Sequence, residues 1–85
     1  MKLQIPTPLL SYTSAREVEA EGATLAAVLS DLDRRFPGIR FRVLDEQGRL
    51  RRHIRFFVAN GQIFDPAQEL HAGDTLVIVQ ALSGG

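Results

Sequence analysis

The 85-residue sequence contains no cysteine. This absence excludes a disulfide framework, a cysteine-ligated zinc site, an iron–sulfur cluster and a cysteine nucleophile. If the chain handles sulfur, no side-chain thiol can carry it. A chain of this length forms one domain and buries only about 60–65% of the surface that its unfolded form exposes. That favours a single core without a deep active-site cleft, and so favours a protein that is not an enzyme.

A net charge is also missing, since ten acidic side chains balance ten basic ones. No overall field therefore draws the chain to nucleic acid or to an anionic membrane. Acids dominate the first half of the sequence and arginines crowd the middle, which predicts a basic patch beside an acidic one. Residues 49–57 combine arginine with phenylalanine, a composition also found in nucleic-acid-binding strands. The neutral total favours a charged strand that resists edge-to-edge aggregation, so no nucleic-acid partner is expected.

Long apolar segments are absent as well. No run of residues approaches the length that spans a membrane. The positive charge of Lys2 is not followed by the apolar stretch of a signal peptide. We therefore expect a cytoplasmic protein without a membrane partner.

The sequence also lacks the usual signatures of metal, acid–base and phosphate sites. His53 and His71 have no neighbouring ligands at metal-binding spacing, so no metal site is expected. Asp45, Asp65 and Asp74 lie in turn sequences, where a carboxylate helps to close the backbone. No glycine-rich phosphate-binding loop occurs. The chain is therefore predicted to bind no cofactor of its own.

The first half of the sequence predicts two strands and a helix. Leu3 and Ile5 alternate with polar residues, and the alternation returns over residues 15–20. Thr24 is a good N-cap residue, and apolar residues follow it at helical spacing. These are Leu25, Val28, Leu29, Leu32 and Phe36. Pro37 is expected to end the helix, because the residue before a proline resists helical angles.

The second half predicts three more strands. Residues 39–50 show no clean period, whereas residues 54–58 alternate. Asn60-Gly61 is the strongest short signal of a hairpin, because a type I′ turn needs positive φ at both positions. Residues 75–79 form the last strand. The economical arrangement is an α+β fold of the β-grasp (ubiquitin-like) kind, a mixed sheet of about five strands with one main helix across one face.

The chain is expected to divide into a β-grasp domain at residues 1–82 and a flexible Gly-Gly tail at residues 83–85. Glycine costs ordering entropy and adds no packing, so one interpretation of the tail is a disordered end without function. The other interpretation is chemical. Gly84 and Gly85 have no side chains and Ser83 is small, so these residues can thread a narrow slot in an enzyme and present the terminal carboxylate to ATP.

Adenylation would make that carboxylate reactive. A carboxylate is a poor acylating agent, whereas an acyl adenylate has an electrophilic carbonyl. Sulfide or a persulfide can then displace AMP and leave a thiocarboxylate on Gly85. In this interpretation the catalytic groups belong to the partner, and the chain is its substrate and a carrier.

The order and spacing of three sequence blocks resemble the ThiS/MoaD family of ubiquitin-like sulfur carriers. The blocks are Phe57-Val58-Ala59-Asn60-Gly61, Leu70-His71-Ala72-Gly73-Asp74-Thr75-Leu76-Val77-Ile78 and the ending Ala81-Leu82-Ser83-Gly84-Gly85. The opening Ile5-Pro6-Thr7 and the helix are similar to the branch of the family that serves cysteine biosynthesis. The resemblance spans essentially the whole chain. It departs from the family at Gln80, where members often carry proline, and at Ala59, which lies between Val58 and Asn60.

The resemblance implies two partners. The first is a ubiquitin-activating-like adenylyltransferase that uses ATP and magnesium. The second is a synthase that accepts the sulfur for cysteine, thiamine, molybdopterin or a secondary metabolite. Gly85 would bear first the adenylate and then the thiocarboxylate. Two alternatives stay open: a protein modifier that forms isopeptide bonds through Gly85, and a non-covalent binding module that uses the basic patch.

Strand parity independently predicts a docking surface. If the even-numbered residues of the strands at 54–58 and 75–79 face the helix, the odd-numbered residues face the open side of the sheet. An apolar patch would then lie beside the tail, rimmed by Arg51 and His53, and such patches mark protein interfaces. The predicted partner-binding surface consists of Arg55, Phe57, Val77, Val79 and Leu82. A second possibility is that dimerisation or the 39–50 segment covers this face.

Overall fold

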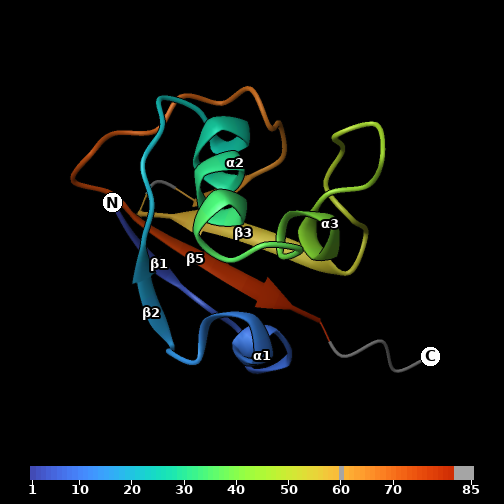
Figure 1. The fold of residues 1–85 in the computed structure, drawn as a ribbon. Helices are drawn as coiled ribbons and strands as arrows, with labels where there is room; N and C mark the ends of the chain where they lie inside the picture. The colour runs from blue at the N-terminus through green and yellow to red at the C-terminus, as the bar shows by residue number, and fades with distance from the viewer. Residues whose placement is uncertain (60, 82–85) are drawn as a thin grey trace.

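The computed structural model describes residues 1–59 and 61–81, and Figure 1 shows the path of the chain through its strands and helices. The strands are β1 (Lys2–Gln4), β2 (Glu17–Glu19), β3 (Ile54–Val58), β4 (Gly61–Ile63) and β5 (Thr75–Gln80). The helices are the 3₁₀ helix η1 (Thr7–Leu9) and the α-helices α1 (Leu10–Thr13), α2 (Leu25–Arg35) and α3 (Arg40–Val43).

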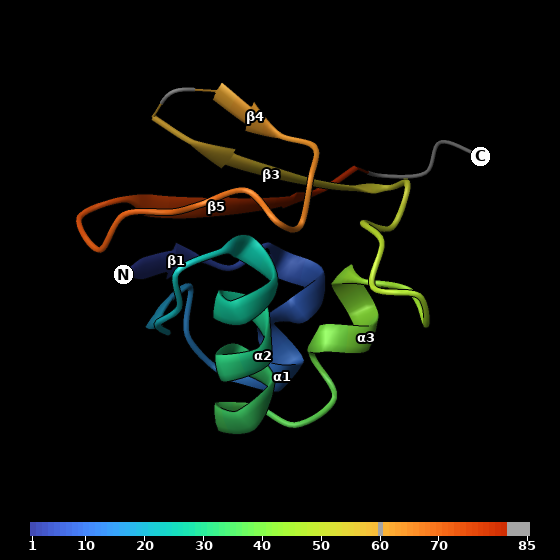
Figure 2. The same cartoon turned by 90° about the horizontal axis from the view of Figure 1, so that it is seen from above.

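The strands form one five-stranded mixed sheet in the order β2-β1-β5-β3-β4. β1 and β5 are parallel, and the other neighbouring pairs are antiparallel. β5 therefore occupies the middle of the sheet, between β1 and the β3–β4 hairpin (Figure 2). With α2 packed across one face, this is the β-grasp fold that the sequence predicts.

α2 is the main helix, and it begins where the sequence predicts. The hydroxyl oxygen of Thr24 accepts a hydrogen bond from the backbone N–H of Ala27 at 3.2 Å, which satisfies one free donor of the first turn. The helix ends at Arg35, and Phe36 follows as its C-cap residue. The buried stripe consists of Leu25, Val28, Leu29 and Leu32. The expected period therefore identifies the face of the helix that packs on the sheet.

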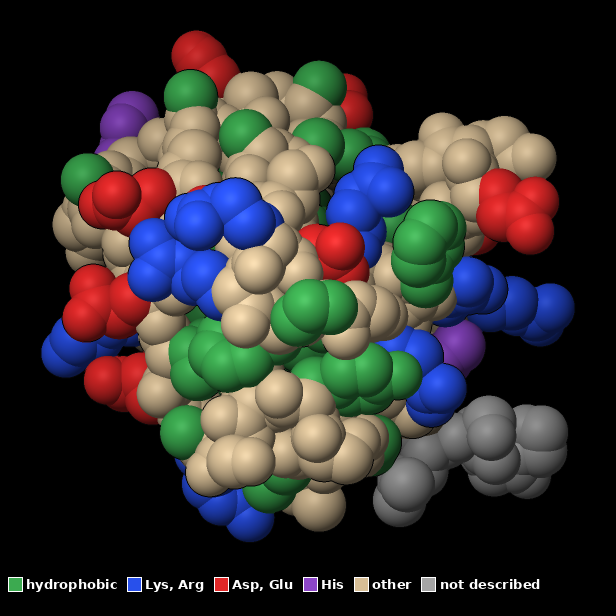
Figure 3. Space-filling model, viewed as in Figure 1, with side chains coloured by type: hydrophobic (Ala, Val, Ile, Leu, Met, Phe, Trp, Pro, Cys, Tyr) green, Lys and Arg blue, Asp and Glu red, His purple; other side chains and the backbone are tan. Residues whose placement is uncertain are grey.

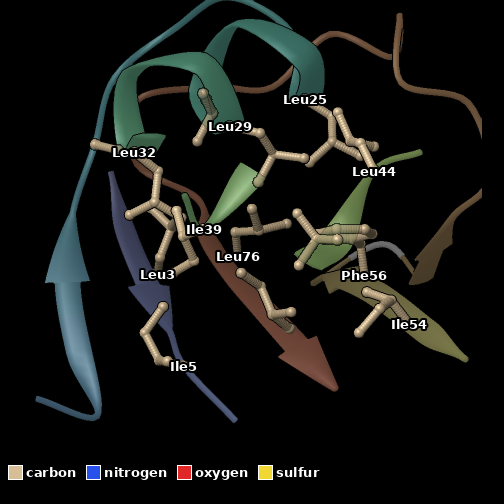
Figure 4. Close-up of a cluster of buried hydrophobic side chains, with 14 of the residues drawn as sticks. Leu3, Ile5, Leu25, Leu29, Leu32, Ile39, Leu44, Ile54, Phe56 and Leu76 are labelled. Carbon is tan, nitrogen blue, oxygen red and sulfur yellow. The ribbon is translucent and has the colours of Figure 1, made fainter. Parts of the chain in front are cut away.

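The core fills the space between α2 and the sheet. Figure 4 shows Leu29 and Leu32 of α2 pointing toward Leu3, Phe56 and Leu76 of the strands. All five side chains are fully buried. Burial of one large apolar side chain contributes roughly 1.5–3 kcal/mol, so this layer is the main stabilising contact of the fold.

The helices of the described residues all lie on one side of the sheet (Figure 2). The other side of the sheet has no helix across it in the same view. This side is called the open face below. The arrangement leaves the outward side chains of the central strands available to another protein.

The turn into α2 depends on a close approach at Gly22. A Cβ atom added there would lie 2.6 Å from the backbone nitrogen of Val28. Next to it, a carboxylate oxygen of Asp31 accepts the backbone N–H of Glu21 at 2.9 Å. The segment between β2 and α2 therefore packs directly on the helix, and glycine is the residue that fits.

The structure adds three short helices to the single main helix of the sequence prediction. Ile39 and Val43, four residues apart at the ends of α3, are both fully buried. A carboxylate oxygen of Asp33 accepts the backbone N–H groups of Gly38 and Arg40 at 3.0 Å each, which fixes the connection from α2. The other two, η1 and α1, follow Pro6. Segments of three or four residues are too short to show a helical period, and their tertiary contacts hold them.

Some sequence predictions fall outside the described part of the chain. The turn predicted at Asn60 is one of them, although the β3–β4 hairpin itself is present and Gly61 has a φ of 126°. The division between a domain at 1–82 and a tail at 83–85 is another. Among the helices in residues 1–59 and 61–81, none combines the length and the apolar character that a membrane crossing requires.

Candidate partner-docking face and tail exit

Two cross-strand pairs form the centre of the open face. Arg55 of β3 lies opposite Val79 of β5, and Phe57 lies opposite Val77. Residues opposite one another on neighbouring strands share a face of the sheet. The even-numbered neighbours of these four residues on the same strands are buried under the helices: Ile54, Phe56, Leu76 and Ile78. The register thus has the parity that the sequence predicts, and it brings together four of the five residues of the predicted docking surface.

The open face is partly apolar. The side chain of Val79 is 40% exposed, and Arg55, Phe57 and Val77 are half-buried among their neighbours. In the described part of the chain, three large apolar side chains are exposed: Phe41, Phe64 and Val79. Val79 is the one in the cross-strand pairs of the open face, which makes it a candidate anchor for a partner. Leu82, the fifth predicted residue, lies outside the described residues.

Phe64 is a further exposed apolar residue, which the sequence prediction missed. It follows β4 directly and its side chain is 76% exposed. Its predecessor Ile63 is fully buried and pairs with Phe56. The sequence did contain a signal for the exposure of Phe64. In an extended chain, successive side chains point to opposite faces, so the residue that follows the buried Ile63 is expected to point away from the core.

The tail exit is the end of the sheet at which β5 finishes beside the start of β3. Gln80 pairs with Ile54 in the last position of the ladder. One residue further, the backbone N–H of Ala81 donates to the carbonyl oxygen of His53 at 2.8 Å. The chain is thus held to β3 up to Ala81. The predicted site residues Ser83, Gly84 and Gly85 lie outside the described residues, as Leu82 does.

Two open grooves flank the tail exit. On the β1 side, a groove of about 470 Å³ is lined by Pro6, Thr7, Pro8, Arg16, Ile78, Val79 and Gln80. On the β3 side, a groove of about 480 Å³ is lined by Asp45, Arg49, Leu50, Arg51, Arg52 and His53. Both are open to solvent along the surface. The grooves therefore lie on either side of the end of β5.

Arginines give the tail exit its charge. Within the described residues, Arg16, Arg51, Arg52 and Arg55 form no ion pair. Arg51 donates to the carbonyl oxygen of Phe41 at 2.7 Å, and Arg55 donates to the carbonyl oxygens of Arg52 and Ile54. Figure 3 shows basic and histidine side chains together at the right-hand edge of the molecule. The positive charge at this end is therefore open to a partner.

The perturbed carboxylates of the chain have structural partners. Three groups lower the pKa of Asp31 to about 2: the hydrogen bond from the backbone N–H of Glu21 has the largest effect, and the hydrogen bonds from Arg34 and Arg35 have smaller ones. Hydrogen bonding by the backbone N–H of Arg49 lowers the pKa of Asp45. Both groups are held in the charged form by groups of their own surroundings, which suits a structural role and not proton transfer. In the described part of the chain, no three metal-binding side chains lie together.

Comparison with known proteins gives similarities along nearly the whole chain. A model described as the ThiS family matches residues 3–85. The sulfur carrier protein CysO of Mycobacterium tuberculosis is 35% identical over 89 residues, which cover 98% of this chain and 96% of that protein. Among solved structures, a chain of the Amycolatopsis orientalis BexX/CysO complex has a TM-score of 0.90 at 34% identity, covering 99% of this chain and 98% of that one. Mycobacterium tuberculosis CysO has a TM-score of 0.88 at 32% identity, covering 95% and 98%.

Proposed function

Because the chain belongs to the ThiS family, we propose that it is a sulfur carrier that works through the carboxylate of Gly85. A relative that is 35% identical over nearly its whole length is named a sulfur carrier protein, which supports this role. The observation that carries the proposal is the geometry of β5. This central strand stays paired with β3 up to Ala81 and ends beside an open, partly apolar face. A partner that docks on that face lies next to the point at which the described part of the chain ends.

The proposed chemistry has two steps. An oxygen of the Gly85 carboxylate attacks the α-phosphorus of ATP, and pyrophosphate leaves. Sulfide then attacks the acyl carbon, AMP leaves, and a thiocarboxylate remains. If the donor is a persulfide, its attack gives an acyl disulfide, and a thiol of the partner cleaves the S–S bond, so that a disulfide forms on the partner and the thiocarboxylate is released. Activation of a poor acyl donor before the transfer splits one difficult step into two easier ones. The chain supplies the acyl group, and the partner supplies the catalytic groups, the ATP site and the magnesium ion.

The first partner in this proposal is a ubiquitin-activating-like adenylyltransferase. Val79, Phe57 and Val77 form the apolar part of its docking surface, with Arg55 at the rim and Leu82 following the strand. Ser83 and Gly84 give the tail access, because small residues fit a channel that excludes larger side chains. We place the reaction in the cytoplasm, where ATP is at hand.

The second partner in this proposal is a synthase that takes the sulfur from the thiocarboxylate. A structural relative forms the BexX/CysO complex of Amycolatopsis orientalis, which supports a carrier that binds a second protein. The open face and the two grooves beside the tail exit can serve both partners in turn. The two complexes then exclude each other, since they use the same strands and the same tail.

The test is an intact mass spectrum of the chain after incubation with ATP, magnesium, a sulfur source and the adenylyltransferase of the same host. The expected product has one oxygen replaced by sulfur, and fragmentation places the change in the C-terminal peptide. A chain with one extra residue after Gly85 is the matched control and is expected to give neither adenylate nor thiocarboxylate.

Other outcomes separate the alternatives. An adenylate that never gives a sulfur product, together with covalent conjugates in the host, would replace the carrier by a protein modifier. Acceptance of the extended chain without trimming contradicts the role of Gly85. If the enzyme is active on another carrier and leaves this chain unmodified, the proposal is wrong for this pair, and a non-covalent binding role takes its place.

A further inference from the structure

The basic residues of this chain are almost all arginines. The sequence contains nine arginines and one lysine, Lys2. A lysine amine that loses its proton attacks activated acyl groups, whereas a guanidinium keeps its proton in proteins and does not. The α-amine of Met1 is the other primary amine. A carrier with an activated C-terminus therefore holds two groups that could consume its own acyl group.

The amine of Met1 is shielded by the fold. It donates to the carbonyl oxygen of Ala20 at 3.0 Å, and Met1 is only 9% exposed. This contact extends the pairing of β1 with β2, since Ala20 in turn donates its backbone N–H to the carbonyl oxygen of Met1 at 3.2 Å. Acylation of this amine requires the strand to open.

The amine of Lys2 is accessible, and it starts from the opposite end of the sheet from the tail exit. The Lys2 side chain is 61% exposed, and its Nζ lies 4.0 Å from a carboxylate oxygen of Glu17. Lys2 pairs with Thr75 at the start of β5. From Thr75 to Ala81 a strand advances by about 20 Å. The four residues after Ala81 span about 14 Å at full extension, and they would have to turn back along the sheet to approach Lys2.

The basic residues around the tail exit are all arginines, whose guanidinium groups do not react with an activated acyl group. Arg16 lines one groove, and Arg51 and Arg52 line the other. Arg55 lies opposite Val79, two residues before Ala81. A lysine at any of these positions would bring a nucleophile within the span of the tail.

We propose that this placement of amines keeps the activated C-terminus from acylating its own molecule, and that Lys2 is the one site at which a second copy of the chain can be joined to it. In that reaction the neutral amine attacks the acyl carbon of Gly85, a C–N bond forms, the bond to the leaving group breaks, and the amine proton goes to solvent. The biological use of this arrangement rests on the proposed function, while its chemistry can be tested without any partner enzyme.

The experiment uses the full chain with a thioester at Gly85, prepared by intein cleavage with mercaptoethanesulfonate and kept at mildly alkaline pH. Intact mass spectrometry follows loss of the thiol, and peptide mapping locates each new amide. Wild type is expected to form no intramolecular amide. Its covalent dimer should form faster as the concentration rises, with the linkage at Lys2, and Lys2→Arg should abolish it.

Two lysine variants, one at Arg55 in β3 and one at Ala59 directly after β3, differ in their distance from the tail exit. Arg55→Lys is expected to form an intramolecular amide at a rate independent of concentration. Effective concentrations of short tethers are in the millimolar range, so at about 20 μM protein this reaction should exceed dimer formation on the order of fiftyfold. Ala59→Lys is the matched control: Ala59 is exposed and follows β3 at the end remote from the tail exit, two residues after Phe57, which pairs with Val77. It should give no intramolecular amide.

The proposal is overturned by an intramolecular amide at Lys2 or Met1 in the folded wild type. Equal rates of internal amide formation in Arg55→Lys and Ala59→Lys would also overturn it, because distance from the tail exit would then not matter. Since the thioester is made chemically, these outcomes are independent of whether an adenylyltransferase accepts the chain. Circular dichroism and urea unfolding check that each variant is folded.

Discussion

The backbone N–H of Ala81 donates to the carbonyl oxygen of His53 at 2.8 Å, one residue beyond the last strand pair of β3 and β5. Because this bond continues the ladder, it holds Ala81 beside β3. Bonded and non-bonded positions alternate in an antiparallel pair. The N–H of Gln80 therefore points away from β3, toward the groove on the β1 side.

Ala81→Pro removes the donor of this bond. A single hydrogen bond contributes about 0.5–1.5 kcal/mol, so we expect kcat/KM for adenylation by the partner to fall by about two- to tenfold. The free energy of unfolding in urea should fall by no more than the same amount. Gln80→Pro is the matched control, because the N–H that it removes does not face β3. Equal losses in the two variants would show that proline itself, and not the bond to His53, causes the effect.

Val79→Asp tests the open face as a docking surface. A carboxylate at the centre of an apolar contact is costly, and truncation of an anchor residue typically costs more than 1 kcal/mol. We expect KM of the adenylyltransferase for the chain to rise about tenfold or more, with kcat nearly unchanged. Phe41→Asp is the control on the helix side, where Phe41 is 54% exposed. A larger rise in KM for Phe41→Asp than for Val79→Asp would move the docking surface to the helix side.

Asp31→Asn tests the carboxylate that holds the β2–α2 segment to the helix. The pKa of Asp31 is lowered from 3.8 to about 2, first by the backbone N–H of Glu21 and then by Arg34. Its stabilising effect is therefore fully present above pH 3.8 and is lost as the pH falls through 2. We expect the variant to have a lower urea midpoint than wild type at pH 7. The difference should shrink as the pH falls through this window.

The control for this pH dependence is Glu46→Gln, a change at an exposed acid in the α3–β3 loop. Its urea midpoint should follow that of wild type across the same range. If the gap between wild type and Asp31→Asn is as wide at pH 2 as at pH 7, the loss comes from the shape of the side chain and not from its charge.

Gly22→Ala tests the close approach of the β2–α2 segment to the helix. The added Cβ would lie 2.6 Å from the nitrogen of Val28, which is backbone and cannot move aside alone. We expect a loss of about 1–3 kcal/mol in the free energy of unfolding, measured by urea denaturation. Gly73→Ala meets no atom within 4 Å and should change this free energy by less than about 0.5 kcal/mol. If Gly22→Ala and Gly73→Ala lower the free energy of unfolding equally, the loss comes from replacing a flexible glycine and not from a clash with Val28.

The main elements of the fold follow from local patterns in the sequence. The helix α2 could be predicted because about three turns of regular apolar spacing follow a threonine cap. β3 and β5 could be predicted with their faces, since Phe56 and Ile78 are buried and their neighbours Phe57 and Val77 are not. The short helix α3 could not, because two buried residues and the bonds to Asp33 hold it, and these contacts exist only once α2 is in place.

The candidate site also has a part that could be predicted from the sequence and a part that could not. Strand parity places Arg55, Phe57, Val77 and Val79 on one face without knowledge of the fold. Phe64 was missed, because it lies just beyond the end of β4. The lack of ion pairs around Arg51 and Arg52 was also beyond prediction, since the partners of an arginine depend on which distant segments fold beside it.

The central position of β5 has a consequence for the synthesis of this protein. Until residues 75–80 have been translated, β1 with β2 and β3 with β4 have no strand to join them. The sheet is then two separate hairpins, and neither can close the core under α2. In the proposed function, the strand that completes the fold also carries the end that is activated, so a molecule would become a substrate for activation in the same event that makes it resistant to proteases.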